Sequence, residues 1–481
     1  MRTLIVIASF LLAGSTQAQI SFFKTFSNDS FDRGEGVVQL KDSSYLITGS
    51  SSSFSNSQQA FIMHIDSAGN YLWSRSYGGE ETERGRRIFH VENDGIYVLG
   101  QTSSASGKFF DLYFLKTDLE GNILFEKNFG GAEYEDIHDA IMLKDTSMII
   151  VGESYSNTGK QQNAWGMRLS NEGEVLWEQQ WGGNRKDLAS SVKALNDTIV
   201  YICGYQYNQD SLSRKGFLSR MNIDGTLEWT RFYGEQKEHA LRDLHIFRDT
   251  IRGVGHFIAE GTSVRNFHRI MFDLSGNIIR DRYEFHGGDY DVLSIQRYGS
   301  NLYFLSKQVT QEPDIPTYPD GSDNLLYAYD HMLFYKGLAL NKSLNGDDQF
   351  NQLIRTSDQG ILAVGFNSMD DHVKVTVLKL DARDPISNAS LTNGSGELVE
   401  LNELSSSDRV RIYPNPSSGM IHVDSEMKIR EFRLYSTQQQ LLRIERGMLT
   451  NLSLVDLSPG VYFLHLYTDD GQQFVYQLHR K

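Results

Sequence analysis

The chain has little cysteine or proline, and it has no long apolar segment after its first residues. Cys203 is the only cysteine among 481 residues, so no disulfide can form within the chain, and its apolar setting (VYICGY) predicts an inert core residue. Only 7 residues are proline whereas 42 are glycine, a balance typical of many tight turns. No later segment reaches the roughly 18 apolar residues of a membrane-spanning helix. We therefore expect a soluble mature protein without a membrane span.

Positive charge is in deficit. Lys and Arg number 46 and Asp and Glu 61, which gives a net charge of −15. This balance argues against nucleic acid and anionic lipid as partners. Aromatic residues make up 12% and charged residues 22% of the chain, which is enough apolar material for one large or two medium domains.

Motifs of catalysis are also missing. The sequence has no G-x-S-x-G, no H-E-x-x-H and no pair of cysteines, and its 13 histidines show no metal-ligand spacing. Catalysis is therefore not supported, no cofactor is expected, and the sequence leaves open whether a metal binds.

The first residues have the pattern of an export signal. Arg2 precedes an apolar run from Leu4 to Ala13, and Thr16 and Ala18 are small residues suited to a cleavage site. This pattern predicts a signal peptide at residues 1–18, removed before Gln19.

A repeat of about 52 residues follows. The stretch IDSAGNYLWSRSYGGEE, from Ile65, recurs in related form four times, and its turn glycines are spaced by 52, 52, 52 and 51 residues: Gly69, Gly121, Gly173, Gly225 and Gly276. A second landmark is a short apolar run that ends at Gly49, Gly100, Gly152, Gly204, Gly255, Ser306 and Gly365. A fixed period of this kind is an architectural signal. It gives seven units.

Each unit predicts four short strands with apolar residues at every second position, as at Phe61 and Met63. Seven such units predict an all-β fold, a seven-bladed β-propeller over residues 19–381. The segment ISFFKTF (Ile20 to Phe26) resembles a fourth strand, while VKVTVLKLD (Val373 to Asp381) resembles a third strand that lacks a fourth. We therefore expect the N-terminal strand to complete the last blade.

The repeat motif itself is expected to be structural. DSAGNYLW has the spacing of the docking repeat of quinoprotein-type propellers and is similar to it over about eight residues, but no cofactor-binding set maps onto this chain. Asp66 and Asn70 are turn formers, and Trp73 is expected to be a packing residue.

Acidic residues gather in the loops that follow the fourth strand of each unit. In a propeller these loops share one face, so they predict an acidic ring around the channel mouth. Exposed turns that only aid solubility remain the alternative. The candidates for ligand binding in this ring are Glu80, Glu133, Asp136 and Asp187.

The sixth unit departs from the repeat by an insertion, Lys307 to Asp330. It holds three prolines and three tyrosines, and long loops on rigid scaffolds often carry recognition. Neutral decoration is the alternative. Its candidate ligand-binding residues are Tyr318, Asp320, Asp323, Tyr327 and Tyr329.

The chain changes character after Asp381. Residues 382–408 are polar and rich in Ser, Asn and Gly, which predicts a flexible linker. Strand signals return from Arg409, and residues 409–481 predict a small C-terminal β-sandwich.

This last segment resembles a known family. YPNPSSG, then LYSTQQQLL, then LSPGVYFLHL and a basic end are similar to the type A C-terminal sorting domain of the type IX secretion system of Bacteroidetes. The residues that carry the resemblance are Tyr413, Pro414, Asn415, Pro416, Gly419, Pro459 and Gly460. The resemblance implies an export address that the type IX secretion machinery recognises, and a product at the outer-membrane surface or outside the cell.

Two functions from different classes fit these observations. The first is an exported binding or scaffold propeller with an extracellular glycan, protein or cation as its ligand. The second is a hydrolase or lyase of extracellular polysaccharide or peptide, which needs a pair of carboxylates at the propeller mouth. The missing motifs of catalysis favour the first function, and the sequence leaves the second open.

Overall fold

The computed structural model describes most of residues 20–480, and it divides the chain into two compact units, unit 1 (Met1–Glu397) and unit 2 (Leu398–Lys481). The described residues are 20–27, 31–53, 57–104, 109–131, 133–155, 162–182, 186–207, 213–234, 238–259, 262–284, 290–298, 301–308, 323–330, 335–342, 348–369, 372–380, 390–392, 410–413, 419–425, 428–436, 441–447, 451–468 and 473–480. The predicted signal peptide lies outside them. The two units divide inside the predicted linker.

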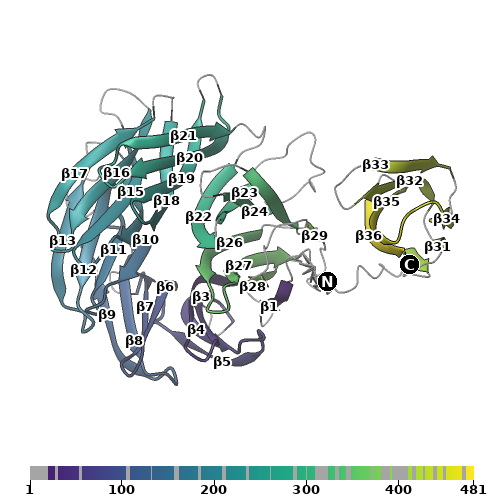
Figure 1. The fold of residues 1–481 in the computed structure, drawn as a ribbon. Helices are drawn as coiled ribbons and strands as arrows, with labels where there is room; N and C mark the ends of the chain where they lie inside the picture. Colours follow the sequence, from purple (N-terminus) through teal and green to yellow (C-terminus); the bar gives the residue numbers. More distant parts are fainter. Residues whose placement is uncertain are drawn as a thin grey trace, which may run out of the picture. The chain divides into compact units, whose positions relative to one another are not determined.

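Unit 1 repeats an antiparallel group of four strands (Figure 1). In chain order the groups are β2 (Asp32–Gln39), β3 (Tyr45–Ser51), β4 (Gln59–Ile65) and β5 (Tyr71–Tyr77); β6 (Glu83–Val91), β7 (Gly95–Thr102), β8 (Asp111–Thr117) and β9 (Ile123–Phe129); β10 (Glu135–Met142), β11 (Met148–Ser154), β12 (Asn163–Leu169) and β13 (Val175–Trp181); β14 (Asp187–Ala194), β15 (Ile199–Tyr207), β16 (Arg214–Asn222) and β17 (Leu227–Tyr233); β18 (Glu238–Phe247), β19 (Thr250–Ile258), β20 (Arg265–Asp273) and β21 (Ile278–Glu284); β22 (Tyr290–Tyr298), β23 (Asn301–Gln308), β24 (Asp323–Asp330) and β25 (Tyr335–Lys342); and β26 (Asp348–Arg355), β27 (Ile361–Met369) and β28 (His372–Leu380) with β1 (Ile20–Phe26). No helix occurs among the described residues.

The N-terminal strand completes the last group. β1 runs antiparallel to β28, with Ile20 opposite Leu380 and Phe26 opposite Val375. Phe22 is buried and packs in a cluster with residues of both the first and the last group, among them Val37 and Val377. The pairing expected from the two ends of the repeat region is therefore confirmed.

The first strands of the groups contact one another in a closed cycle. β2 contacts β6, and the contacts continue through β10, β14, β18, β22 and β26, which in turn contacts β2. Apolar clusters fill the space between neighbouring groups, as where Ile47 and Met63 meet Val364. The groups are thus arranged around a common centre, which is a propeller-like fold.

The turn of the repeat motif is a hydrogen-bonded Asx turn. The Asp66 side chain accepts hydrogen bonds from the backbone N–H groups of Ala68 and Asn70, at 2.9 and 2.8 Å. Gly69 has φ of 79°, a left-handed conformation that glycine adopts without steric cost. The motif is therefore a structural turn, as the sequence predicts.

The aromatic residue of the motif covers the turn of the next unit. A Cβ atom at Gly121 would lie 3.2 Å from the Trp73 ring, and Trp229 stands in the same way over Gly276. The Tyr77 hydroxyl also donates a hydrogen bond to the carbonyl of Gly121 at 2.8 Å. In these units the motif thus ties one four-stranded group to the next, and Trp73 is a packing residue as expected.

A β-bulge interrupts the first strand of every group. In β2 the register moves from Gly34 opposite Gly49 to Gly36 opposite Thr48, so Glu35 has no partner on β3. A Cβ atom at Gly49 would lie only 1.8 Å from the carbonyl oxygen of Arg33. The landmark glycine of the second strand is therefore needed because the bulged backbone approaches it closely.

Two parts of the sequence prediction differ from the structure. Asp323–Asp330, expected within the inserted loop, is strand β24, because it pairs along its whole length with β23. Within the predicted linker, β29 (Ser390–Thr392) pairs in parallel with β25. In both places backbone pairing overrides a loop-like composition.

Unit 2 has two sheets. One contains β30 (Val410–Tyr413), β31 (Met420–Ser425) and β34 (Asn451–Ser453); the other contains β33 (Leu441–Arg446), β32 (Ile429–Ser436), β35 (Gly460–Thr468) and β36 (Gln473–Arg480). One apolar cluster draws on both sheets, with Ile421 and Leu452 from the first and Phe432 and Leu464 from the second. Unit 2 therefore has a hydrophobic core of its own.

Candidate functional site

A cavity of about 200 Å³ lies at the centre of unit 1. Its wall contains the unpaired bulge residue from the first strand of every group: Glu35, Arg86, His138, Ser190, Arg242, Leu293 and Asn351. A bulge turns a side chain out of the normal alternation of a strand. The repeated bulge is thus the local feature that points one side chain per group towards the centre.

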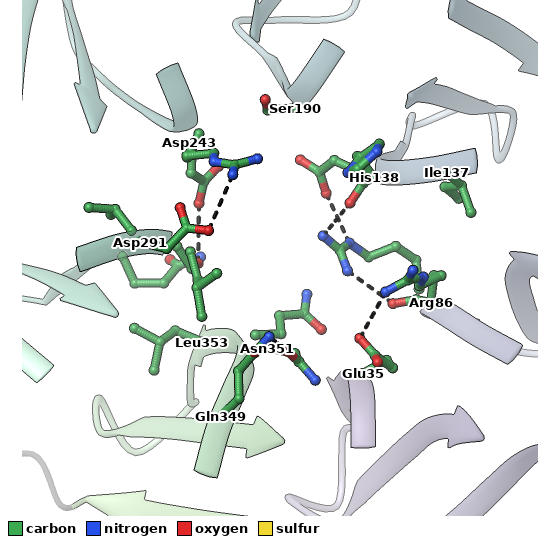
Figure 2. A pocket seen from close by; sticks show the side chains of 18 of the residues that line it. Glu35, Arg86, Ile137, His138, Ser190, Asp243, Asp291, Gln349, Asn351 and Leu353 are labelled. Atoms are coloured by element: carbon green, nitrogen blue, oxygen red, sulfur yellow. Dashed lines mark hydrogen bonds and ion pairs between the residues drawn. The ribbon is translucent and has the colours of Figure 1, made fainter. Parts of the chain in front are cut away.

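The cavity wall is polar and its charges balance. It has four basic residues, four acidic residues, four amides, one histidine and two serines, against four aliphatic residues. Figure 2 shows Arg86 and His138 on one wall, across the cavity from Asp243 and Asp291. Cations therefore stand beside the carboxylates of this cavity, and the acidic ring expected at the channel mouth, which involves other residues, stays a prediction.

Ion pairs across the cavity wall connect neighbouring sheets. Arg86 pairs with Glu35 at 3.3 Å, and Arg242 pairs with Asp291 at 3.2 Å. Each of these pairs joins the first strands of two successive groups. The charges of the cavity thus have a structural role as well as a chemical one.

Asp139 is a highly connected carboxylate of this wall. It accepts hydrogen bonds from Arg87 Nε at 2.9 Å, from Lys193 Nζ at 2.7 Å and from Ser191 Oγ at 2.9 Å. Burial alone would raise its pKa, but the Lys193 and Arg87 cations hold the pKa below its usual value. Lys193 also pairs with Asp243 at 2.9 Å. These contacts join four consecutive four-stranded groups.

Amide side chains close the ring between the last group and the first. Gln352 accepts a hydrogen bond from the backbone N–H of Val37 at 2.7 Å, and Asn351 donates one to the carbonyl of Gly34 at 2.8 Å. Amides both donate and accept hydrogen bonds. Together with Gln349, Asn351 and Gln352 give this side of the cavity polar groups without charge.

Asp136, His138 and Glu153 form a cluster at the same wall. His138 Nε2 lies 4.0 Å from Asp136 Oδ2 and 3.9 Å from Glu153 Oε2. Burial, and then the nearby Asp136 carboxylate, raise the pKa of Glu153 to about 8. Burial lowers the pKa of His138 to about 4. Three groups that can bind a metal ion therefore meet next to the cavity.

The four acidic candidates lie in different environments. Glu80 is exposed and Glu133 is half-buried, whereas Asp136 and Asp187 are buried. Asp187 accepts a hydrogen bond from the backbone N–H of Tyr207 at 2.9 Å. None of the four is among the described residues that line the cavity. The structure thus brings only Asp136 close to the site, through its contact with His138.

Carboxylates at the start of the first strands hold neighbouring segments in place by accepting hydrogen bonds. Glu83 accepts hydrogen bonds from Thr102 Oγ1 at 2.7 Å and from the backbone N–H of Gly79 at 2.9 Å. Glu135 is bound in the same way by Ser154 Oγ at 2.9 Å. The regular acidic residues of these loops therefore include structural anchors, which the sequence alone does not separate from ligand-binding groups.

Only three of the five candidate residues of the inserted segment lie among the described residues. Tyr318 and Asp320 lie outside the described residues, while Asp323, Tyr327 and Tyr329 are positions of β24. Recognition by this segment stays a prediction.

The bulge residues were missed at the sequence level, although a signal for them exists. Arg86 lies 14 residues before Gly100, and Glu35, His138, Ser190 and Asn351 stand at the same distance before their landmark glycines. Because the glycine marks where the bulged strand comes close, counting back from it would have found the cavity wall.

The residues that resemble a sorting motif are also partly described. Gly419 precedes β31 and accepts a hydrogen bond from the backbone N–H of Leu454 at 2.6 Å. Pro459 and Gly460 are exposed at the start of β35, and Tyr413 ends β30. Pro414, Asn415 and Pro416 lie outside the described residues.

Comparison with known proteins identifies the C-terminal segment. Residues 411–477 match the family model of the secretion system C-terminal sorting domain. The resemblance to the type IX sorting domain is therefore confirmed, and the protein is exported to the cell surface or the extracellular space. No curated protein matches the chain.

Several solved structures are similar at low identity. Drosophila Semaphorin 2a has a TM-score of 0.48 at 8% identity, covering 94% of this chain and 96% of its own. The WD40 domain of Neurospora crassa Pan2 has 0.42 at 12%, covering 75% and 91%. An extracellular domain of a one-component system from B. thetaiotaomicron has 0.41 at 10%, covering 96% and 58%. Similarity at this level identifies neither a ligand nor an activity.

The described residues include no helix that is long and apolar enough to cross a membrane.

Proposed function

We propose that the protein is an exported binding propeller, with seven blades, a C-terminal sandwich as its sorting domain, and a ligand site in the central cavity. The observation that carries this proposal is the cavity wall, to which the first strand of every four-stranded group contributes. The closed cycle of contacts between these strands supports the blade count. The shared core of the two sheets of unit 2 supports the sandwich.

The wall chemistry favours a small, polyhydroxylated group. Guanidinium, carboxylate and amide groups all line it, so it offers both donors and acceptors to hydroxyl groups. Its volume of about 200 Å³ is below the roughly 300–1,000 Å³ of pockets for drug-sized ligands. A terminal sugar of an extracellular glycan has a suitable size and polarity.

Binding is favoured over hydrolysis at this site. A polymer hydrolase needs two carboxyl groups free to act on substrate, whereas Glu35, Asp139, Asp243 and Asp291 are each paired with a cation on the cavity wall. Ion-paired carboxylates of this kind suit the positioning of a ligand better than proton transfer to it.

A glycan array probed with the mature chain tests the proposal. Ser190 lines the cavity, and its hydroxyl makes no hydrogen bond among the described residues, so Ser190→Leu fills space without removing an ion pair. We expect this variant to lose at least about tenfold in affinity for any glycan that the wild type binds, a loss of about 1.4 kcal/mol, with little change in melting temperature. The exposed Glu80→Gln serves as the control. Equal glycan affinity of both variants would show that the ligand binds outside the cavity.

Removal of residues 409–481 tests the role of the sorting domain. Unit 2 has its own core, so the truncated protein should still fold and should accumulate in the periplasm. Cell fractionation with the full chain as control measures the location, and thermal melting of the recovered protein measures the fold. Normal surface display of the truncated protein would contradict the assignment.

A further inference from the structure

We propose that Asp136, His138 and Glu153 bind one divalent transition-metal ion of the zinc class at the wall of the central cavity. The inference does not rest on glycan binding. Asp136 and His138 lie on β10 and Glu153 on the adjacent strand β11. The bulge places His138 between the two carboxylates and on the cavity wall. Two hydrogen-bonded strands therefore hold all three side chains.

The spacing of the three groups suits a single ion. One ligand atom from each residue lies within 4.8 Å of the other two, and the His138 distances are 3.9 and 4.0 Å. Zinc binds nitrogen and oxygen ligands at about 2.0–2.2 Å, so two ligands of one ion lie up to about 4 Å apart. Small side-chain rotations bring all three into this range.

The cluster has unmet hydrogen-bonding capacity. Asp136 Oδ1, His138 Nε2 and Glu153 Oε2 are buried and have no hydrogen-bond partner within the described part of the chain. Asp136 and Glu153 are only 8% and 9% exposed, and a buried polar group without a partner destabilises the folded state. A bound cation would satisfy all three groups at once.

A neighbouring hydroxyl orients one of the ligands. Tyr134 Oη donates a hydrogen bond to Asp136 Oδ2 at 2.9 Å. Partners of this kind fix the orientation of ligating groups in metal sites. The lone pairs that Asp136 does not use for Tyr134 remain available to an ion.

Nearby arginines limit the affinity. Arg86 Nη2 lies 3.8 Å from Asp136 Oδ1, but Arg86 is shared with Glu35 at 3.3 Å. The positive charge of Arg242 also acts electrostatically on His138 and Glu153, and it would repel a bound cation. We therefore expect weaker binding than in closed structural zinc sites. An imidazole ligand selects transition metals over calcium and magnesium, and three protein ligands leave a coordination position open towards the cavity.

Metal titration of the mature chain tests the proposal. The protein is purified without a histidine tag, stripped with a chelator, and titrated with Zn²⁺ and separately with Ca²⁺ in a calorimeter. We expect about one Zn²⁺ per chain, a higher melting temperature with Zn²⁺, and no saturable binding of Ca²⁺. Absence of saturable Zn²⁺ binding overturns the proposal.

Two variants with matched controls locate the ion. His138→Gln and Glu153→Gln should each weaken Zn²⁺ binding at least about tenfold, while His90→Gln on the neighbouring first strand β6 and the exposed Glu80→Gln should bind as the wild type does. Thermal melting of the metal-free proteins shows which variants fold. If only one of His138→Gln and Glu153→Gln folds, its Zn²⁺ affinity alone tests the site. X-ray absorption should show an imidazole ligand that is lost in His138→Gln. Unchanged affinity or an unchanged metal spectrum in that variant overturns the site.

Discussion

Deleting Ile20–Phe26 is expected to lower the melting temperature of unit 1 sharply or to prevent its folding. The deletion removes every pairing of β28 with β1 and exposes the apolar surface that Phe22 covers. A buried Phe side chain contributes about 1.5–3 kcal/mol, and each lost hydrogen bond about 0.5–1.5 kcal/mol. The sum is a large part of the roughly 5–15 kcal/mol by which a folded domain is stable.

Thermal melting of residues 27–481 against residues 19–481 measures the effect. Lys24→Ala is the matched control, because Lys24 lies on the same strand with its side chain exposed, and it should melt as the wild type does. A synthetic peptide of residues 20–26 should restore part of the lost stability. An unchanged melting temperature after the deletion would contradict the role of β1 in closing the ring.

Asp139→Asn is expected to lower the free energy of unfolding by about 3–5 kcal/mol, because it removes one partner of a buried ion pair and leaves cations uncompensated. Lys193 keeps Asp243 as a partner, but Arg87 loses its carboxylate at 2.9 Å. Chemical denaturation with urea measures the change.

Asp197→Asn is the control for this substitution. Lys144 and Asp197 form an ion pair at 2.8 Å with side chains 82% and 59% exposed, whereas Lys193 and Asp139 pair at 2.7 Å with side chains only 26% and 9% exposed. Exposed pairs contribute about 0–1 kcal/mol. Similar losses for both substitutions would show that the connections around Asp139 add nothing to stability.

Most of the fold that could be predicted from the sequence was predicted from the repeat. Gly69 and Trp73 each depend on local geometry that recurs every unit, so their roles as turn and packing residues were predictable. The pairing of β1 with β28 was also predictable, since each end of the repeat region lacks the strand that the other supplies. Strand β24 was not, because its composition resembles the loop before it and its pairing with β23 is decided by tertiary context.

The candidate site was harder to predict for a physical reason. Acidic loop residues such as Glu80 and Asp187 are conspicuous in the sequence, yet Asp187 is bound to the backbone of Tyr207. Of the two partners of His138, Asp136 is two residues away in the sequence, but Glu153 lies 15 residues away on another strand. A bulge changes which side chains share a face, and strict alternation along a strand does not reveal it.

The pairing of the first strand with the last also sets the order of assembly. β1 is synthesised first, but its partner β28 ends more than 350 residues later at Leu380, so this contact has the largest loop-closure entropy in the unit and forms late. Until then the apolar edges of the outermost sheets are open to association with other chains. A chaperone that shields these open edges until β1 and β28 pair would therefore raise the yield of native protein.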